Sequence, residues 1–529
     1  MKEILLGNEA IVRGALESGV QFVATYPGTP ASEIGNIFYK LSQNKEFGGY
    51  FEFSVNEKLA MEAGMGASYS GLKTLIAMKN FGLNVASDPL LPFVYTGTKG
   101  PTVIMIADDP SCHSSAQSEE NTRAFASLAH IPILEPSDAQ ECKDFIKLAF
   151  QISEKYNIPV MVRTTTRVSH QKMLVELGSL PAGQQAFFGD FVKDANRFVT
   201  LPPRVLEMKK ELLEKIEKIR AFVEIKQKLE IKNLKLGIIT SGISYLYVME
   251  ALKELKLNLP VLKLDFFYPL PEKKIQSFLK NLKKVLVVEE LEPYLEKEVK
   301  ILAQKTHCRV QVFGKDLIPE VGELKPEIVT EAIAELTGRK LKIKNQKLKI
   351  PVLKRSPILC PGCPYWLVIS AVKKAVDVNQ VVFGGEIGCY MLFGTSVVNL
   401  QDYLACMGSS VGIGHGIKKA TNNKKKLIAF VGDSSFFHAG IPALINTVFN
   451  KSNPLIIILN NNTTAMTGHQ PHPGNAGISI ENIVRACGVK NLKVIDLVNQ
   501  PEFIQTVKEF VEAPEVSVII AKHPCIFVK

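Results

Sequence analysis

Residues 426–468 read KLIAFVGDSSFFHAGIPALINTVFNKSNPLIIILNNNTTAMTG, and two apolar runs in this stretch decide the fold. The run LIAFV ends at Gly432 and Asp433, and the run LIIIL ends just before Asn461. A helical pattern from about 438 to 449 joins them, which predicts a buried strand, a helix and a second buried strand. Strands joined in this way run parallel, so Asp433 and Asn461 are expected at the same edge of one sheet.

The same alternation of short apolar runs and helical patterns fills most of the 529 residues. It predicts an α/β fold with three doubly wound parallel-sheet domains. We expect these domains at 1–175, 234–337 and 356–529. A helical connector is expected at 176–233, and a basic linker at 338–355.

Composition excludes several classes of protein. The chain is 46% hydrophobic and 22% charged, as is ordinary for a globular domain, and no apolar run approaches the length of a membrane span. The first residues contain no signal-peptide core, so we expect a cytoplasmic protein without membrane insertion. The net charge of +11 invites a nucleic-acid partner, but the lysine-rich stretches 209–235 and 338–355 have few or no aromatic residues for base stacking. We therefore expect no nucleic-acid binding; a basic surface equally suits an acidic electron carrier or an anionic substrate.

Asp433 and Asn461 provide hard oxygen ligands of the kind that Mg²⁺ prefers. Gly432 removes a side chain where a diphosphate would approach the backbone, and the start of the following helix favours an anion. A helix cap and an isolated turn are the alternative interpretation. The complete pattern of strand, Gly-Asp, helix, strand and Asn-Asn favours a site for diphosphate and Mg²⁺.

This pattern resembles the thiamine diphosphate motif, in which GD is followed by NN after about 25 intervening residues; here residues 435–459 intervene. The resemblance implies that Asp433, the side chain of Asn461 and the backbone carbonyl of Thr463 hold Mg²⁺. Ser434 stands where the motif usually has another glycine.

Enzymes that use thiamine diphosphate also need a carboxyl group on the pyrimidine ring, where it supports proton removal from the cofactor. Glu57, at the start of a predicted helix, is one candidate, and Glu62, one turn later, is another. Spacing does not decide between them, and an acidic residue also favours a helix N-terminus without any further role.

Five strings carry a wider resemblance that covers essentially the whole chain. They are YPGTPASE, VNEKLAMEAGMGAS, DDPSCHSS, CPGCP and NNNTTAMTGHQPHPG, in this order. Together they resemble the large subunits of indolepyruvate:ferredoxin oxidoreductases, within the 2-oxoacid:ferredoxin oxidoreductase family. The resemblance implies a pyrimidine-binding first domain, a transketolase C-terminal-like middle domain and a diphosphate-binding last domain.

The resemblance also implies the site residues. It makes Glu57 the pyrimidine partner, places Thr29 near the substrate carbonyl, and makes His113, His469 and His472 candidates for substrate binding or proton transfer. A structural hydrogen-bonding role is the alternative for each histidine. The implied cofactor-binding set is Tyr26, Pro27, Gly28, Glu57, Gly388, Gly432, Asp433, Ser434, Asn461, Thr463 and Met466.

Four of the nine cysteines are expected to act together. Cys360 and Cys363 form a CPGC pair, which is a natural half-site for a [4Fe–4S] cluster. By the resemblance, Cys389 and Cys525 match the other two ligands of the cluster nearest the cofactor in related pyruvate oxidoreductases. A zinc site, a thioredoxin-like pair or unligated core cysteines are the alternatives.

The activity implied by the resemblance is oxidative decarboxylation of arylpyruvates, namely indolepyruvate, phenylpyruvate and 4-hydroxyphenylpyruvate. CoA would take the acyl group, ferredoxin would accept the electrons, and a smaller β subunit would complete a hetero-oligomer. Typical large subunits carry CxxCxxCxxxCP runs that this sequence lacks, so we expect a separate electron-transfer module or a shorter lineage. A non-oxidative decarboxylase or carboligase, an oxidoreductase for other 2-oxoacids, and an inactive assembly subunit are the alternatives.

Overall fold

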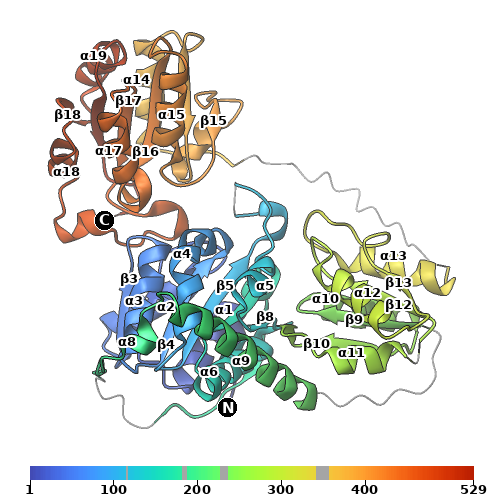
Figure 1. Cartoon of the computed structure of the whole chain (residues 1–529). Helices are drawn as coiled ribbons and strands as arrows, with labels where there is room; N and C mark the ends of the chain where they lie inside the picture. Colours follow the sequence, from blue (N-terminus) through green and yellow to red (C-terminus); the bar gives the residue numbers. More distant parts are fainter. Residues whose placement is uncertain (115–116, 182–187, 227–235, 281, 341–356, 529) are drawn as a thin grey trace. The chain divides into compact units, whose positions relative to one another are not determined.

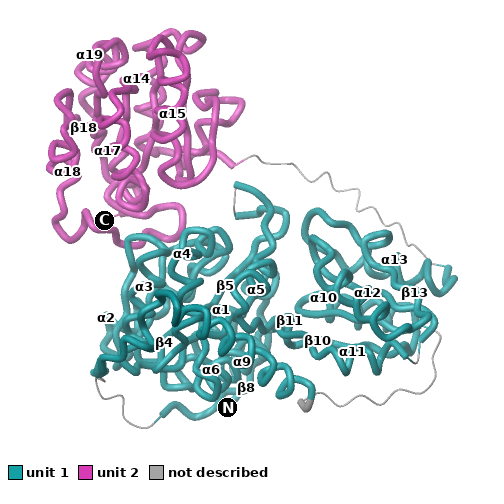
Figure 2. Tube along the Cα trace, viewed as in Figure 1, with its two compact units in different colours: residues 1–345 teal, residues 346–529 magenta. Residues whose placement is uncertain are grey.

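The computed structural model describes residues 1–114, 117–181, 188–226, 236–280, 282–340 and 357–528. Its contacts divide the chain into two compact units, 1–345 and 346–529 (Figure 2). From residue 341 onward, the predicted basic linker lies outside the described residues. None of the described helices is long and apolar enough to cross a membrane.

The larger sheet of the first unit is parallel except at one edge (Figure 1). Its strands, in spatial order, are β11 (Phe266–Tyr268), β6 (Ile133–Leu134), β7 (Val160–Thr165), β5 (Thr102–Asp108), β4 (Thr74–Lys79), β2 (Phe22–Thr25) and β3 (Tyr50–Phe53). The helices of this part are α1 (Gly7–Glu17), α2 (Ser32–Gln43), α3 (Glu57–Tyr69), α4 (Asn80–Thr96), α5 (Ala124–Ala129), α6 (Ala139–Tyr156) and α7 (Thr166–His170). A small antiparallel pair, β1 (Lys2–Leu6) and β8 (Lys172–Glu176), lies beside them.

A second sheet in the first unit is wholly parallel. Its order is β10 (Val261–Leu264), β9 (Leu236–Ser241), β12 (Lys284–Val288) and β13 (Gln311–Phe313). Its helices are α10 (Ser244–Leu255), α11 (Glu272–Leu279), α12 (Tyr294–Lys305) and α13 (Pro326–Thr337). The connector expected between the two sheets contains α8 (Ala195–Phe198) and the long α9 (Arg204–Lys226).

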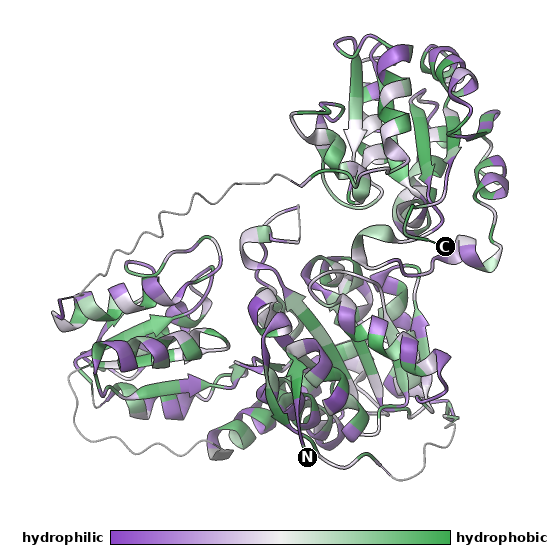
Figure 3. Ribbon diagram, turned by 180° about the vertical axis from the view of Figure 1, so that it is seen from behind, coloured by the Kyte–Doolittle hydropathy of each residue, from purple (hydrophilic) through white to green (hydrophobic). Residues whose placement is uncertain are grey.

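The second unit contains one parallel sheet, with the order β15 (Tyr403–Leu404), β14 (Val381–Gly385), β16 (Lys426–Gly432), β17 (Leu455–Asn460), β19 (Ser517–Lys522) and β18 (Asn491–Asp496). Its helices are α14 (Tyr365–Ala375), α15 (Ser409–Ala420), α16 (Asp433–Ser435), α17 (Ile441–Phe449), α18 (Ile480–Ala486) and α19 (Gln500–Val511). Successive side chains of a strand point to opposite faces. Phe430 and its neighbour Val431 are both buried, so helices cover both faces, and the inner strands are apolar throughout (Figure 3). The predicted class, α/β with doubly wound parallel sheets, is confirmed.

The helix after β16 begins earlier than the sequence predicts. We expected it from about residue 438, but α16 starts at Asp433 and continues through a π-helical turn, Phe436–Gly440, into α17. Phe436 and Phe437 are buried, so their apolar side chains belong to the core and not to a loop. Consequently the helix begins directly at the carboxyl end of the strand.

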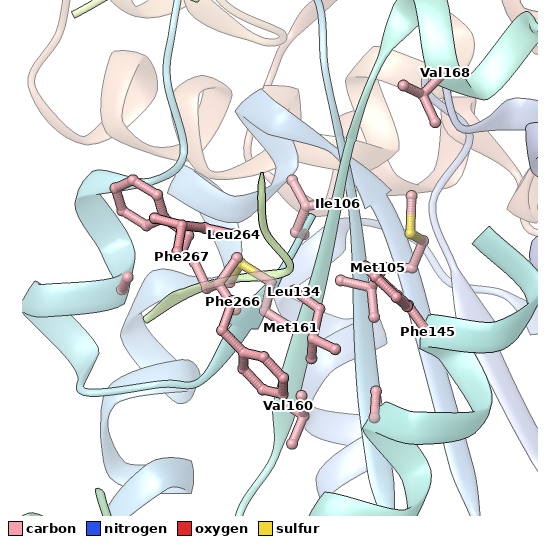
Figure 4. Close-up of a cluster of buried hydrophobic side chains, with 14 of the residues drawn as sticks. Met105, Ile106, Leu134, Phe145, Val160, Met161, Val168, Leu264, Phe266 and Phe267 are labelled. Atoms are coloured by element: carbon pink, nitrogen blue, oxygen red, sulfur yellow. The ribbon is translucent and has the colours of Figure 1, made fainter. Parts of the chain in front are cut away.

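The two sheets of the first unit are joined by an edge strand. β11 follows directly after β10 of the smaller sheet in the chain, but it pairs antiparallel with β6 of the larger sheet, with Phe266 opposite Leu134. Figure 4 shows Phe266 among Leu134, Val160 and Met161. This shared apolar contact explains why residues 1–345 form a single compact unit.

A buried ionic network crosses the same junction. Arg123 donates from Nη2 to Glu135 at 2.6 Å and from Nη1 to Glu289, at the end of β12, at 3.0 Å. Its guanidinium also lies over the ring of Phe267, 4.8 Å from the centroid. Burial opposes the charge of Glu135, but Arg123 and Arg163 outweigh it and lower the pKa of Glu135 to about 2. The network therefore holds the two sheets together through paired charges.

Replacing Arg123 with Met should destabilise the first unit strongly, because it leaves Glu135 and Glu289 buried without their main cation. We expect a loss of about 3–5 kcal/mol in the free energy of unfolding, measured by urea denaturation with circular dichroism. Arg167→Met is the matched control: this arginine also bridges the two sheets, to Glu323, but its side chain is 56% exposed. It should cost less than about 1 kcal/mol. Equal losses in the two variants would contradict the role assigned to burial.

Candidate active site

Asp433 and Asn461 lie where the sequence predicted them, at the carboxyl ends of adjacent parallel strands. Gly432, the last residue of β16, pairs with Leu459 of β17. The carboxylate of Asp433 is buried and accepts two backbone hydrogen bonds, from Ser434 to Oδ1 and from Asn462 to Oδ2, both at 2.8 Å. These donors hold the carboxylate in place.

The string HQPHPGN forms a loop that supports the Asn-Asn turn. The side chain of Asn475 donates to the backbone carbonyl of Asn462 at 3.1 Å. Gly474 donates its N–H to Nδ1 of His472 at 3.1 Å, so the hydrogen of a neutral imidazole is on Nε2, which lies 3.2 Å from Asp433 Oδ2. His472 therefore contacts the carboxylate of Asp433.

The donor set at this edge fits a magnesium ion. Asp433 provides carboxylate oxygens, and the amide oxygen of Asn461 is buried beside the backbone of Thr463, which donates to it at 3.2 Å. Ser434, the departure from the usual glycine, accepts a hydrogen bond from Thr464 at 3.1 Å. Oxygen ligands on two neighbouring strand ends could hold Mg²⁺ and leave positions open for phosphate oxygens.

Two buried residues that the sequence did not single out lie beside the glycines of this edge. Tyr390 donates its hydroxyl hydrogen to Glu386 at 2.5 Å. A Cβ atom at Gly432 would lie 2.9 Å from the ring of Tyr390, and one at Gly388 would lie 2.5 Å from it. Burial raises the pKa of Glu386 to about 8. Only the tertiary structure shows this pair, because Glu386 in GGEIGCY looks like an ordinary loop carboxylate.

The four expected cluster cysteines line a single cavity of about 250 Å³ in the second unit. Cys360, Cys363, Cys389 and Cys525 share it with Asn461, Tyr365, Met466 and His469. Burial raises the pKa of the Cys389 thiol to about 12, with Cys363 and Cys525 adding to the shift. Among the described residues, no three His, Cys, Asp or Glu side chains could hold a single metal ion. A four-iron cluster is larger than one ion, and four thiols around one cavity are a fitting donor set for it.

Glu57 lies in the first unit, at the N-terminus of α3, as predicted. Its side chain is buried against α4, where a Cβ atom at Gly82 would lie 3.0 Å from Glu57 Oε1. Glu62, the competing carboxylate, is exposed and lies 3.6 Å from Lys58. Gly64 of α3 allows close packing on Ile76, because a Cβ atom at this glycine would lie 2.5 Å from the Ile76 side chain.

The loop Tyr26–Pro27–Gly28–Thr29 follows β2 at the carboxyl edge of the larger sheet. Tyr26, Pro27 and Gly28 are buried, and Thr29 precedes a cis proline. A Cβ atom at Gly28 would lie 2.8 Å from the side chain of Lys79, so glycine is needed for this close approach. The side-chain oxygen of Thr29 is 3.5 Å from that of Ser32.

The candidate histidines have different surroundings. His113 is exposed, and its Nε2 lies 3.5 Å from Glu323, which lies between β13 and α13. His469 has a left-handed backbone, is exposed, and lies beside the ring of Phe527 at the cysteine cavity. Only His472 contacts a predicted metal ligand among these three histidines in the described residues.

Family comparisons agree along the whole chain. Residues 386–521 match the thiamine pyrophosphate enzyme C-terminal TPP binding domain, and residues 13–221 match the thiamine diphosphate-binding domain of pyruvate flavodoxin/ferredoxin oxidoreductases. Residues 226–350 match the indolepyruvate oxidoreductase domain. The indolepyruvate oxidoreductase subunit IorA of Methanothermobacter thermautotrophicus is 44% identical over 99% of this chain and 87% of its own length.

The chain belongs to the indolepyruvate oxidoreductase IorA family. IorA of Pyrococcus horikoshii is 40% identical over 99% of this chain and 86% of its own length. A solved structure of 2-oxoglutarate:ferredoxin oxidoreductase from Magnetococcus marinus shares the fold, with a TM-score of 0.52 and 18% identity, over 63% of this chain and 65% of that one. The protein is thus a thiamine diphosphate-dependent oxidoreductase subunit.

Gly432→Ala should damage the second unit, because the new methyl group would push against Tyr390 and its bond to Glu386. We expect a loss of about 1–3 kcal/mol in the free energy of unfolding. Trp366, in α14, is the only tryptophan of the chain, so its fluorescence follows this unit during urea denaturation. Gly412→Ala in α15 is the control: its Cβ atom meets nothing within 4 Å, and a helical alanine should gain up to about 1 kcal/mol. Equal effects would contradict the contact with Tyr390.

Proposed function

We propose that this chain is the catalytic subunit of an enzyme that oxidatively decarboxylates arylpyruvates. The substrates are indolepyruvate, phenylpyruvate and 4-hydroxyphenylpyruvate, the products are the aryl-acetyl-CoA thioesters and CO₂, and ferredoxin takes the electrons. A smaller β subunit completes a hetero-oligomer. Family membership supports the substrate class, because the relatives are named indolepyruvate oxidoreductase subunits. The reaction is cytoplasmic, where free thiols stay reduced.

The observation that carries the proposal is the cysteine cavity. Oxidation in one-electron steps needs a one-electron acceptor, and a non-oxidative decarboxylase needs none. Cys360, Cys363, Cys389 and Cys525 line one cavity with Asn461, the proposed magnesium ligand. A [4Fe–4S] cluster on these thiolates would lie in the same unit as the diphosphate site.

Thiamine diphosphate, when bound, supplies the carbon nucleophile that attacks the keto group of the substrate and makes loss of CO₂ possible. Asp433, Asn461 and the carbonyl of Thr463 would hold the magnesium ion. Gly388 and Gly432 are the proposed cofactor-binding glycines of this edge, and each also makes room for the ring of Tyr390. Met466 of the second unit and the loop Tyr26–Gly28 of the first unit are further proposed cofactor-binding residues.

Glu57 would hold a proton at the pyrimidine ring nitrogen of bound thiamine diphosphate, which would support proton removal from the cofactor. Its burial at a helix N-terminus keeps water from the carboxyl group. Thr29 lies near the substrate carbonyl. His113 and His469 are the proposed groups for substrate binding and proton transfer, and the exposure of both is compatible with contacts to a partner or substrate.

Iron and acid-labile sulfide should be about four of each per chain in protein purified without oxygen with its β subunit. Cys360→Ser and Cys525→Ser should each lower both contents, because each removes a thiolate ligand. Cys487→Ser is the matched control, since this cysteine lies in the same unit but does not line the cavity. An unchanged iron content in the first two variants would rule out the proposed ligands, and iron-free protein that binds thiamine diphosphate would favour non-oxidative chemistry.

Glu57→Gln should lower turnover of phenylpyruvate by about 100-fold or more, because the amide cannot exchange a proton with the pyrimidine ring. The circular dichroism spectrum should stay unchanged, since the two side chains have the same shape. Glu62→Gln, one turn further along α3 and exposed, is the control and should retain full turnover. Normal turnover of Glu57→Gln, or an equal loss in Glu62→Gln, would remove Glu57 from its role.

A further inference from the structure

Lys79 and Asn80 lie where β4 ends and α4 begins, and neither residue has a role in the proposed function above. β4 lies between β2 and β5 in the larger sheet, so its carboxyl end adjoins the loop that contains Gly28. The stem of Lys79 packs against this glycine, where a Cβ atom would lie 2.8 Å from Lys79 Cγ. The stem of Lys79 therefore contacts the loop that contains Gly28 and Thr29.

The ammonium group of Lys79 has no ion pair or hydrogen bond among the described residues. Its Nζ lies 5.0 Å from the ring centroid of Phe81, over an apolar surface. Burial lowers the pKa of Lys79, while the charges of Glu57 and then Asp109 raise it. A half-buried cation next to the proposed pyrimidine partner is thus available for an anionic ligand.

Asn80 provides a second, independent sign of a ligand. Its side chain is fully buried, yet neither its amide nitrogen nor its amide oxygen has a hydrogen-bond partner among the described residues. Buried polar groups are nearly always paired, and leaving one unpaired costs about 1–3 kcal/mol. The adjacent N-terminus of α4, a helix of 17 residues, adds a favourable potential for negative charge.

We propose that Lys79 and Asn80 bind the carboxylate of the 2-oxoacid substrate. A 2-oxoacid presents only acceptors at its reacting end, two carboxylate oxygens and one keto oxygen. The ammonium of Lys79 and the amide N–H groups of Asn80 are donors, so the two sets match. This inference rests on the proposed function, since it assigns the residues that hold the substrate of that reaction.

The carboxylate is a better match than the other anions of the reaction. The diphosphate of the cofactor is assigned to Asp433 and Asn461 through a metal, and the phosphates of CoA carry more charge than one lysine balances. One cation and one amide suit a single carboxylate. The nearby acidic groups also oppose a polyanion: Glu57 and Asp109 both act on Lys79, as does Glu120.

The test uses the enzyme assembled with its β subunit. Lys79→Met should raise the KM for phenylpyruvate about 10- to 100-fold, the range of a charge-assisted contact, with a smaller change in kcat. The affinity for thiamine diphosphate and the KM for CoA should not change. Lys79→Arg should retain most of the wild-type KM. Lys58→Met is the control, because Lys58 also adjoins Glu57 in the chain, but its side chain is 42% exposed and is paired with Asp88 at 2.7 Å.

A pair of inhibitors separates a carboxylate-binding role from a structural one. Wild-type enzyme should bind 3-phenylpropionate more tightly than 3-phenylpropanamide, and Lys79→Met should bind both equally. An intact preference for the acid in Lys79→Met, or an unchanged KM, would overturn the inference. If Lys79→Met does not fold, Asn80→Asp decides: it should raise the KM for phenylpyruvate, and an unchanged KM would overturn the inference. Wild-type enzyme that oxidises no arylpyruvate would instead refute the proposed function.

Discussion

In a parallel sheet every strand ends at the same edge, and the candidate chemistry of this chain depends on this constraint. In the second unit, the ends of β16 and β17 bring Asp433 and Asn461 together although many residues separate them in sequence. In the first unit, the ends of β2 and β4 bring Gly28 and Lys79 into contact. A shift in the register of either pair would move the polar groups away from one another, so the apolar interior of the strands determines the geometry of the polar edge.

Two buried carboxyl groups of the second unit have different surroundings. Asp433 accepts two backbone hydrogen bonds, which fix the position of its oxygens as suits a metal ligand. Glu386 is fully buried, and burial raises its pKa to about 8, although hydrogen bonds from Tyr390 and Ser435 oppose this shift. The same strand edge therefore provides one carboxylate that is positioned for a cation and one carboxyl group that takes part in internal hydrogen bonding.

Local pattern in the sequence predicts only part of the candidate site. Strand, Gly-Asp, helix and strand are contiguous, so Asp433 and Asn461 could be placed at one edge from the sequence alone. The role of Glu57 could be predicted only from the family resemblance, because its position in the sequence does not relate it to the residues of the second unit. Lys79 and Glu386 could not be found by pattern, because a lysine at a strand end or a glutamate in a glycine-rich loop usually extends into solvent. Their burial depends on side chains and glycines far along the chain, which only the tertiary structure brings near.

The net charge of this protein says little about the charge that a bound ligand would meet. The chain contains 63 Lys and Arg residues and has a net charge of +11, yet water and salt screen most of these cations at the surface. Two unit charges 4 Å apart attract with about 1 kcal/mol in bulk water and about 4 kcal/mol at the lower effective dielectric near protein atoms. The ammonium of Lys79 lies over Phe81, and its stem packs against Gly28, so it experiences the lower effective dielectric. A single desolvated lysine therefore discriminates between a carboxylate and its neutral amide more strongly than the many exposed lysines of the basic surface.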